Sequence, residues 1–78
     1  MPRTTDPYND SAMHITLNGQ ARELPGPTTV IGLLETLGYA GKRVAVERNG
    51  EIVPKSQHGH TALAEGDQIE IVVAVGGG

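Results

Sequence analysis

The sequence predicts an α+β fold, in which one main helix packs on one face of a mixed sheet of about five strands. Three observations lead to this prediction. Two segments of alternating apolar and polar residues each contain an Asn-Gly pair, a segment with helical apolar spacing lies between them, and a third alternating segment lies near the C-terminus. With 78 residues and no cysteine, the chain has room for one small domain that depends on regular secondary structure.

The first hairpin is predicted around Asn18-Gly19. Ile15 and Leu17 alternate with polar residues, which is typical of a half-buried strand. The Asn-Gly pair favours a type I′ turn, because this turn needs a positive φ at both central residues. The return strand is expected over Gln20–Leu24 and ends at the Pro-Gly-Pro segment 25–27, since proline cannot donate a hydrogen bond to a neighbouring strand.

The helix is predicted from the apolar stripe that follows. Four apolar residues recur at the spacing of one helix face, namely Val30, Leu33, Leu34 and Leu37. Thr29 is placed to cap the N-terminus of this helix, and Gly38 to adopt the left-handed conformation just after its end. Gly32 lies inside the helix and weakens it by about 0.5–1 kcal/mol relative to alanine, for a reason that the sequence does not show.

A second hairpin is predicted after the helix. Val44 and Val46 begin a strand that leads to a second Asn-Gly pair at Asn49-Gly50. A short return strand is expected over Glu51–Val53, and Pro54 ends it.

The final strand is predicted over residues 68–75. Residues 55–64 show no clear period and are expected to cross over as a loop with one helical turn, and residues 65–67 form a turn. Two hairpins that flank one helix, followed by a crossover and a last strand, are the element order of the β-grasp fold. The last strand is then expected in the middle of the sheet.

The domain boundaries follow from composition. Residues 1–12 are rich in polar residues and proline without an apolar period, which predicts a disordered N-terminal extension. Residues 13–75 form the β-grasp domain, and residues 76–78 a flexible C-terminal glycine tail. No apolar run has the length of a transmembrane helix, and the N-terminus lacks the apolar stretch of a signal peptide. We therefore expect a cytoplasmic protein with no membrane partner.

The charge balance argues against nucleic acid as a partner. The chain has six Lys and Arg against nine Asp and Glu, a formal net charge of −3, and only two aromatic residues. A nucleic-acid-binding domain usually shows a basic stripe interleaved with aromatic platforms for stacking. The basic residues here are scattered singly apart from Lys42-Arg43.

The sequence suggests neither a catalytic set nor a metal site. It has three histidines, namely His14, His58 and His60. His58 and His60 offer half of a metal site, but no cysteine or clustered carboxylate completes it, so we predict solvated loop histidines. The acidic residues Glu65, Asp67 and Glu70 are interpreted as turn and exposed-strand residues. We therefore assign no catalytic or metal-binding residue and expect a protein that is not an enzyme.

The last strand breaks the expected alternation near its end. Alternation places four residues toward the core, namely Ile69, Ile71, Val73 and Val75. On the opposite face Glu70 is polar as expected, whereas Val72 and Ala74 are apolar. One helix cannot cover both faces of the sheet, so we predict that Val72 and Ala74 form an exposed contact patch for a partner. The alternative is a central strand that is simply rich in valine.

The chain ends in three glycines. Extended at about 3.3–3.6 Å per residue, Gly76, Gly77 and Gly78 reach roughly 10 Å beyond the sheet. Without Cβ atoms they can pass through a channel that is too narrow for other residues. The carboxylate of a terminal glycine is also unhindered, so it can attack a nucleotide phosphate and then be attacked in turn. A frayed end is the alternative interpretation.

Taken together, residues 13–78 resemble the ThiS family of sulfur carriers, a ubiquitin-like β-grasp family related to the small subunit MoaD of molybdopterin synthase. The resemblance rests on four segments, namely TVIGLLETLG at the helix, VAVERNGEIVP across the second hairpin, LAEGDQIEIV at the last strand, and the terminal VGGG. The extension at residues 1–12 departs from the family pattern.

The resemblance implies a protein co-substrate that partner enzymes modify. A ThiF-like enzyme would use ATP to adenylate Gly78, which is then converted to a thiocarboxylate, while Gly76 and Gly77 present it to the partner active site. A ThiG-like thiazole synthase would take this sulfur to form the thiazole of thiamin. Because the chain has no cysteine, a partner persulfide such as that of a cysteine desulfurase must supply the sulfur. No cofactor is expected to bind the carrier itself.

Three alternatives remain open at this point. A molybdopterin-type sulfur carrier shares the fold and the tail. A ubiquitin-like modifier would use the same adenylate but end in an isopeptide bond to a lysine. An unmodified β-grasp binding module would not use its carboxyl end at all.

Overall fold

The structure is a computed structural model that describes residues 12–74 of the chain. The predicted N-terminal extension, apart from Ala12, lies outside the described residues, and so do Val75 and the predicted glycine tail at residues 76–78.

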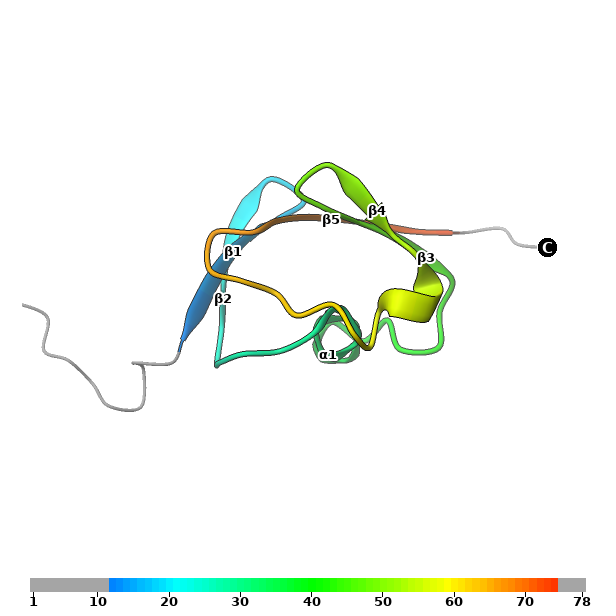
Figure 1. Cartoon of the computed structure of the whole chain (residues 1–78), viewed down its shortest axis with the longest axis horizontal. Coiled ribbons are helices and arrows are strands. Elements are labelled where there is room, and N and C mark those ends of the chain that lie inside the picture. Colours follow the sequence, from blue (N-terminus) through cyan, green and yellow to red (C-terminus); the bar gives the residue numbers. More distant parts are fainter. Residues whose placement is uncertain (1–11, 75–78) are drawn as a thin grey trace, which may run out of the picture.

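The described residues form two layers, a five-stranded sheet and one helix that covers one of its faces (Figure 1). The elements are, in chain order, β1 (Met13–Leu17), β2 (Gln20–Leu24), α1 (Val30–Thr36), β3 (Val44–Arg48), β4 (Glu51–Val53), a 3₁₀ turn (Lys55–Gln57) and β5 (Gln68–Val73). The predicted α+β fold with one main helix is confirmed.

The sheet has the strand order β2-β1-β5-β3-β4, so the last strand lies in its middle, as predicted. β5 pairs in parallel with β1 and antiparallel with β3, while β1–β2 and β3–β4 are the two antiparallel hairpins. β5 ends at Val73, two residues earlier than predicted. The reason is that its partner β3 begins at Val44, which faces Val73, so no strand residue is left for Ala74 to pair with.

Both Asn-Gly pairs form the turns predicted for them. The φ angles are 50° at Asn18 and 83° at Gly19, and 53° at Asn49 and 87° at Gly50. Positive values at both central residues are the requirement of a type I′ turn, whose twist matches that of the flanking strands. The local sequence therefore fixes the register of both hairpins.

The Asn18 side chain in the first turn also holds neighbouring strands together, which the sequence did not indicate. Strand β1 pairs with β5 only at Thr16 and Leu17. Beyond that point the Asn18 side chain accepts a hydrogen bond from the Ile71 amide at 2.8 Å and donates one to the Ile71 carbonyl at 3.2 Å. The side chain thus extends the pairing to a residue that the β1 backbone no longer reaches.

The helix begins and ends as predicted and buries its apolar face. The Thr29 hydroxyl accepts a hydrogen bond from the Gly32 amide at 3.3 Å, and Gly38 has a φ of 81°. The core consists of α1 residues, inward-facing strand residues and one residue of the crossover, namely Met13, Ile15, Leu24, Val30, Leu33, Leu34, Val46, Val53, Leu63, Ile69 and Ile71. The structure also explains Gly32, because a Cβ at this position would clash with the Thr28 hydroxyl.

Candidate functional site

The candidate site lies at the end of the sheet where β5 finishes, which we call the tail end. Ala74 follows Val73 there, and its amide donates a hydrogen bond to the Arg43 carbonyl at 2.9 Å. The residues predicted to be modified or presented to a partner, Gly76, Gly77 and Gly78, lie outside the described residues. The described part of the site is therefore the surface from which the tail departs.

The outer face of the sheet, opposite α1, carries the predicted contact patch. Val72 is 66% exposed and Ala74 is exposed, so the predicted exposure of this patch is confirmed. Ala45 of β3 faces Val72 directly and widens the apolar surface. The role of the patch as an interface stays a prediction.

Acidic side chains border this apolar patch on the same face. Glu47 of β3 lies directly opposite Glu70 of β5, and Ile52 of β4, which is 62% exposed, lies opposite Glu47. Like charges that face each other across strands repel, so this pair does not help to hold the sheet together. The outer face is therefore apolar at the tail end and acidic farther back along β3 and β5.

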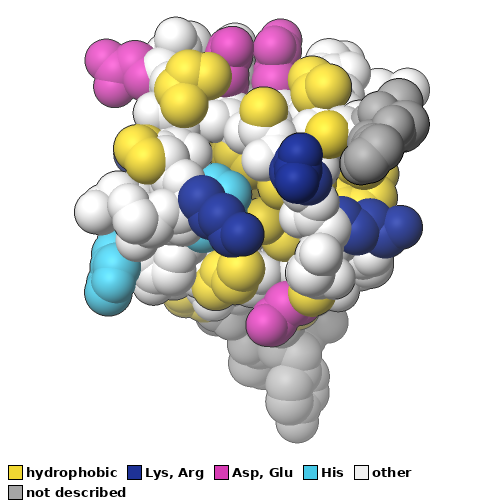
Figure 2. Space-filling view, turned by 90° about the vertical axis from the view of Figure 1, so that its right-hand side faces the viewer, with side chains coloured by type: hydrophobic (Ala, Val, Ile, Leu, Met, Phe, Trp, Pro, Cys, Tyr) yellow, Lys and Arg dark blue, Asp and Glu magenta, His cyan; other side chains and the backbone are white. Residues whose placement is uncertain are grey.

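A pocket of about 210 Å³ opens at the tail end, below the acidic face. Figure 2 shows this end, with acidic side chains along the sheet side, Lys and Arg side chains around an apolar hollow, and a further acidic side chain at the lower edge of this face. Ile31, Leu34 and Val44 supply apolar walls, and three cations, namely Lys42, Arg43 and Lys55, also line the pocket. Sequence reasoning missed this pocket, because its lining residues come from segments that are far apart in the sequence.

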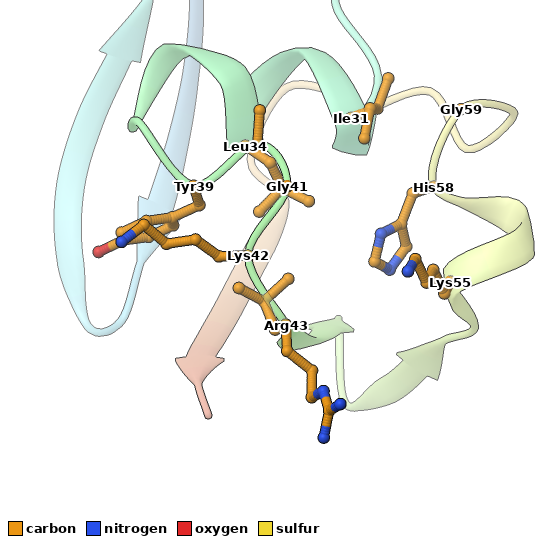
Figure 3. A pocket seen from close by; sticks show the side chains of 11 residues that line it. Ile31, Leu34, Tyr39, Gly41, Lys42, Arg43, Lys55, His58 and Gly59 are labelled. Carbon is orange, nitrogen blue, oxygen red and sulfur yellow. The ribbon is translucent and has the colours of Figure 1, made fainter. Parts of the chain in front are cut away.

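His58 closes one side of the pocket and corrects a prediction. It was predicted to be a solvated loop residue, but its side chain is 5% exposed and faces the hollow beside Lys55 (Figure 3). Its Nε2 lies 3.1 Å from the Val53 carbonyl, which only accepts, so Nε2 is the nitrogen that donates. The His58 carbonyl accepts from the Ile31 amide at 2.9 Å, and these two bonds draw the loop inward. His60 is exposed, as predicted.

Asp67 was predicted to be a turn residue, and the turn is confirmed, since its backbone N–H donates to the Ala64 carbonyl at 3.0 Å. Its side chain is buried at the opposite end of the sheet, just before β5 begins, which the sequence did not indicate. Arg48 Nε donates to its carboxylate at 2.6 Å, the Asn49 amide group at 3.0 Å, and the Ala64 backbone N–H at 2.8 Å. Burial alone would raise the pKa of Asp67, but these hydrogen bonds outweigh it and hold the pKa below its ordinary value.

The remaining acidic and histidine residues of the described chain are exposed or only partly buried. Glu65 accepts from the His14 backbone N–H at 2.8 Å, which lowers the pKa of Glu65, and its other oxygen lies 3.1 Å from the His14 ring. Glu70 is exposed, as predicted. Within residues 12–74 no three side chains of the metal-ligating types gather at one place. No helix of this part of the chain is long and apolar enough to cross a bilayer.

Comparison with known proteins agrees with this architecture. A sequence model of the ThiS family matches residues 15–78. The sulfur carrier protein ThiS of Bacillus subtilis is 40% identical over 65 residues, which cover 82% of this chain and 98% of that protein. The crystal structure of the thiamine biosynthesis protein ThiS from Geobacter metallireducens superposes with a TM-score of 0.72 at 33% identity, covering 85% of this chain and all of that one.

A second group of relatives consists of longer proteins. A thiazole synthase of Paramagnetospirillum magneticum is 47% identical over 66 residues, which are 85% of this chain. This chain spans about a fifth of the length of the curated thiazole synthases that it matches. The family model, the full-length relative and the solved structure are all of ThiS proteins, and the chain belongs to the ThiS family.

Proposed function

We propose that the chain is a sulfur carrier of thiamin biosynthesis, whose Gly78 carboxylate is adenylated and then converted to a thiocarboxylate. The observation that carries this proposal is the ThiS family match, which extends through the three glycines to Gly78. The carrier acts as a co-substrate and not as an enzyme, and the adenylating partner binds and uses the ATP.

The chemistry explains why activation is needed. A carboxylate is a poor target for a nucleophile, because it is negatively charged and has no good leaving group. In the first step a carboxylate oxygen of Gly78 attacks the α-phosphorus of ATP and pyrophosphate leaves, which gives an acyl-adenylate. A persulfide sulfur then attacks the carbonyl carbon and AMP leaves. A thiol finally cleaves the S–S bond of this acyl disulfide, so the thiol ends as a disulfide and Gly78 as a thiocarboxylate.

The composition of the chain constrains the sulfur source. The sequence contains no cysteine, so the persulfide and the reducing thiol belong to partners, such as a cysteine desulfurase and the adenylating enzyme. The same absence means that no thiol of the carrier itself can capture the activated Gly78. The carrier therefore supplies the acyl group and the surfaces that its partners bind, and the partners supply the reactive sulfur.

Two partners follow from the pathway. A ThiF-like enzyme adenylates Gly78, and a ThiG-like thiazole synthase accepts the sulfur. The second partner is supported by the thiazole synthases that contain a segment 47% identical to this chain. We assign the Val72 and Ala74 patch to the adenylating enzyme, because this apolar surface is exposed immediately before the tail that the enzyme must engage.

The test is the intact mass of the full chain after incubation with a ThiF-like enzyme, ATP and a persulfide source. The expected product differs from the substrate by the replacement of one oxygen with one sulfur. The control is a variant with extra residues after Gly78, which should give neither adenylate nor thiocarboxylate. A wild-type chain that stays unmodified would refute the proposal. Covalent attachment of the chain to lysines would instead identify a protein modifier.

A further inference from the structure

We infer that the pocket at the tail end is a second docking surface, which receives one apolar side chain flanked by carboxylates from the enzyme that takes the sulfur. This inference rests on the proposed function and names a surface for its last step. The pocket is separate from the Val72 patch, because it lies between α1 and the segments around Lys42 and Lys55, whereas Val72 lies on the opposite face of the sheet.

The size of the pocket selects the kind of occupant. Pockets for small-molecule ligands usually measure about 300–1,000 Å³. This one has a volume of about 210 Å³, which suits a single side chain better than a nucleotide or a sugar phosphate. Protein interfaces commonly use such pockets for one anchoring side chain near the centre of the contact.

The positive charge of the pocket indicates which residues should surround the anchoring side chain on the partner. Lys42, Arg43 and Lys55 line the pocket together with His58, and none of the lining residues within 12–74 carries a carboxylate. Neither of the two ion pairs within residues 12–74 involves these three cations. The chain as a whole carries a formal net charge of −3, whereas the charged residues that line the pocket are positive. A partner surface with carboxylates around the anchor would complement it.

The position of the pocket ties it to the tail. Arg43 lines the pocket, and its carbonyl accepts the hydrogen bond of the Ala74 amide. Val44, another pocket residue, is the cross-strand partner of Val73. The four residues after Ala74 span at most about 14 Å when extended. Any enzyme that holds Gly78 in its active site must therefore lie against this end of the carrier, which places the pocket within reach of the enzyme that takes the sulfur.

The pocket walls are already held in place. The His58 ring is fixed by its hydrogen bond to the Val53 carbonyl, and the Tyr39 amide donates to the Leu34 carbonyl at 2.8 Å, which folds the segment after α1 back against the helix. A preformed pocket loses little conformational entropy on binding, which favours its use as a docking site.

The two tail-end surfaces differ in sign, and this difference suggests a division of labour. The outer face carries Glu47 and Glu70 on the same side as Val72, whereas the charged residues that line the pocket are cations. The adenylating enzyme and the thiazole synthase need the same tail one after the other, and only one of them can hold it at a time. Because the outer face is assigned to the adenylating enzyme, the pocket is assigned to the thiazole synthase.

The test measures the two steps separately with single charge reversals in the full chain. Arg43→Glu and Lys55→Glu are compared with Arg22→Glu, which makes the same charge change at an exposed position on edge strand β2. The readouts are the rate of thiocarboxylate formation and the Kd for a thiazole synthase, each at low and high salt, with thermal melting to check folding. Ile31→Ser, at an apolar wall residue that is 38% exposed, removes apolar contact without a charge change.

We expect Arg43→Glu and Lys55→Glu to weaken binding to the thiazole synthase about tenfold at low salt and less at high salt, since salt screens exposed charges. Ile31→Ser should weaken it at both salt concentrations. Thiocarboxylate formation should stay near the wild-type rate in all variants. Binding equal to that of Arg22→Glu would overturn the inference, as would a loss confined to thiocarboxylate formation. A wild-type chain that is never thiocarboxylated would instead refute the proposed function on which the inference rests.

Discussion

The charged side chains at the two ends of the sheet differ in whether they are bonded to other residues of the chain. At the end where β5 begins, the Asp67 carboxylate is buried and receives hydrogen bonds from Arg48, Asn49 and Ala64. At the tail end, Lys42, Arg43 and Lys55 make no ion pair within residues 12–74. The first end uses its charges to join segments of its own chain. The second leaves them available to other molecules.

This contrast separates stability from function along one strand. Changes at the start of β5 should lower the stability and leave the sulfur chemistry intact, whereas changes at the tail end should do the reverse. The predictions below test this separation, beginning with the largest expected effect.

Deletion of Gly78 should abolish both adenylation and thiocarboxylate formation. The proposed chemistry takes place on the carboxylate of this residue, and shortening the tail withdraws the acyl group by one residue, about 3.3–3.6 Å. Glycine has no side chain to bury, so the melting temperature should not change. Intact mass and thermal melting measure the two results. A truncated chain that still gains sulfur would show that the reacting carboxylate is not that of Gly78.

Val72→Glu should greatly reduce adenylation and leave folding nearly unchanged. Burial of an unpaired carboxylate against a partner costs several kcal/mol, and roughly 3 kcal/mol corresponds to about 100-fold weaker binding. Val72 is 66% exposed in the free protein, so the same charge costs little there. The adenylation rate, measured by pyrophosphate release, is the readout.

The matched control for Val72→Glu is Ile52→Glu. Ile52 is also apolar, is 62% exposed and lies on the same face of the sheet, but it belongs to edge strand β4. We expect Ile52→Glu to be adenylated at close to the wild-type rate. Equal losses in both variants would show that general charge repulsion, and not a local interface, controls adenylation. Unfolding of Val72→Glu would contradict the expectation that a charge at this exposed position costs the free protein little.

Asp67→Ala should lower the free energy of unfolding by about 1–3 kcal/mol, because it leaves several donors without their acceptor. The Arg48 side chain is one third exposed and can turn to water, which limits the loss. Glu70→Ala, at an exposed position of the same strand, should change stability by no more than about 0.5 kcal/mol. Urea unfolding gives both values. A large loss of adenylation in a folded Asp67→Ala protein would break the separation between the two ends.

The sequence predicts the local features of this fold well, and the reason is that their signals are local. The Asn-Gly turns, the Thr29 cap and the helix stripe each depend on residues a few positions apart, and all were confirmed. The burial of Asp67 depends on Arg48, which is 19 residues away in sequence. His58 is buried because its carbonyl accepts a hydrogen bond from the Ile31 amide of the helix and its ring donates one to the Val53 carbonyl of β4. Tertiary neighbours of this kind leave no periodic trace in the sequence.

The candidate site was predictable only in part for the same reason. Val72 and Ala74 break a pattern of period two, so their exposure could be foreseen from the strand itself. The pocket brings Lys55 from the crossover next to Arg43 from the start of β3 and Ile31 from the helix. No spacing rule links these three positions. The fold had to be known before they could be recognised as one surface.

Acid should destabilise the protein partly through Asp67. The pKa of Asp67 lies below its ordinary value of 3.8, so the folded state favours the carboxylate and the unfolded state binds the proton more readily. The stabilisation is thus complete above the ordinary pKa and is lost as the pH falls through the lowered one. The difference in the free energy of unfolding between wild type and Asp67→Asn, measured in urea at decreasing pH, should shrink as the pH falls below the ordinary pKa. A difference that stays constant would mean that this carboxylate does not titrate with unfolding.

The smallest expected effect concerns Gly32 and tests the close contact at the start of the helix. In a Thr28→Ala background, Gly32→Ala should stabilise the protein by about 0.5–1 kcal/mol, since alanine is a better helix former than glycine. In the wild-type background the new Cβ meets the Thr28 hydroxyl, which must rotate, so the gain should shrink or reverse. A double-mutant cycle of unfolding free energies measures this coupling. If Gly32→Ala has the same effect in both backgrounds, the hydroxyl of Thr28 is not the reason for glycine at this position.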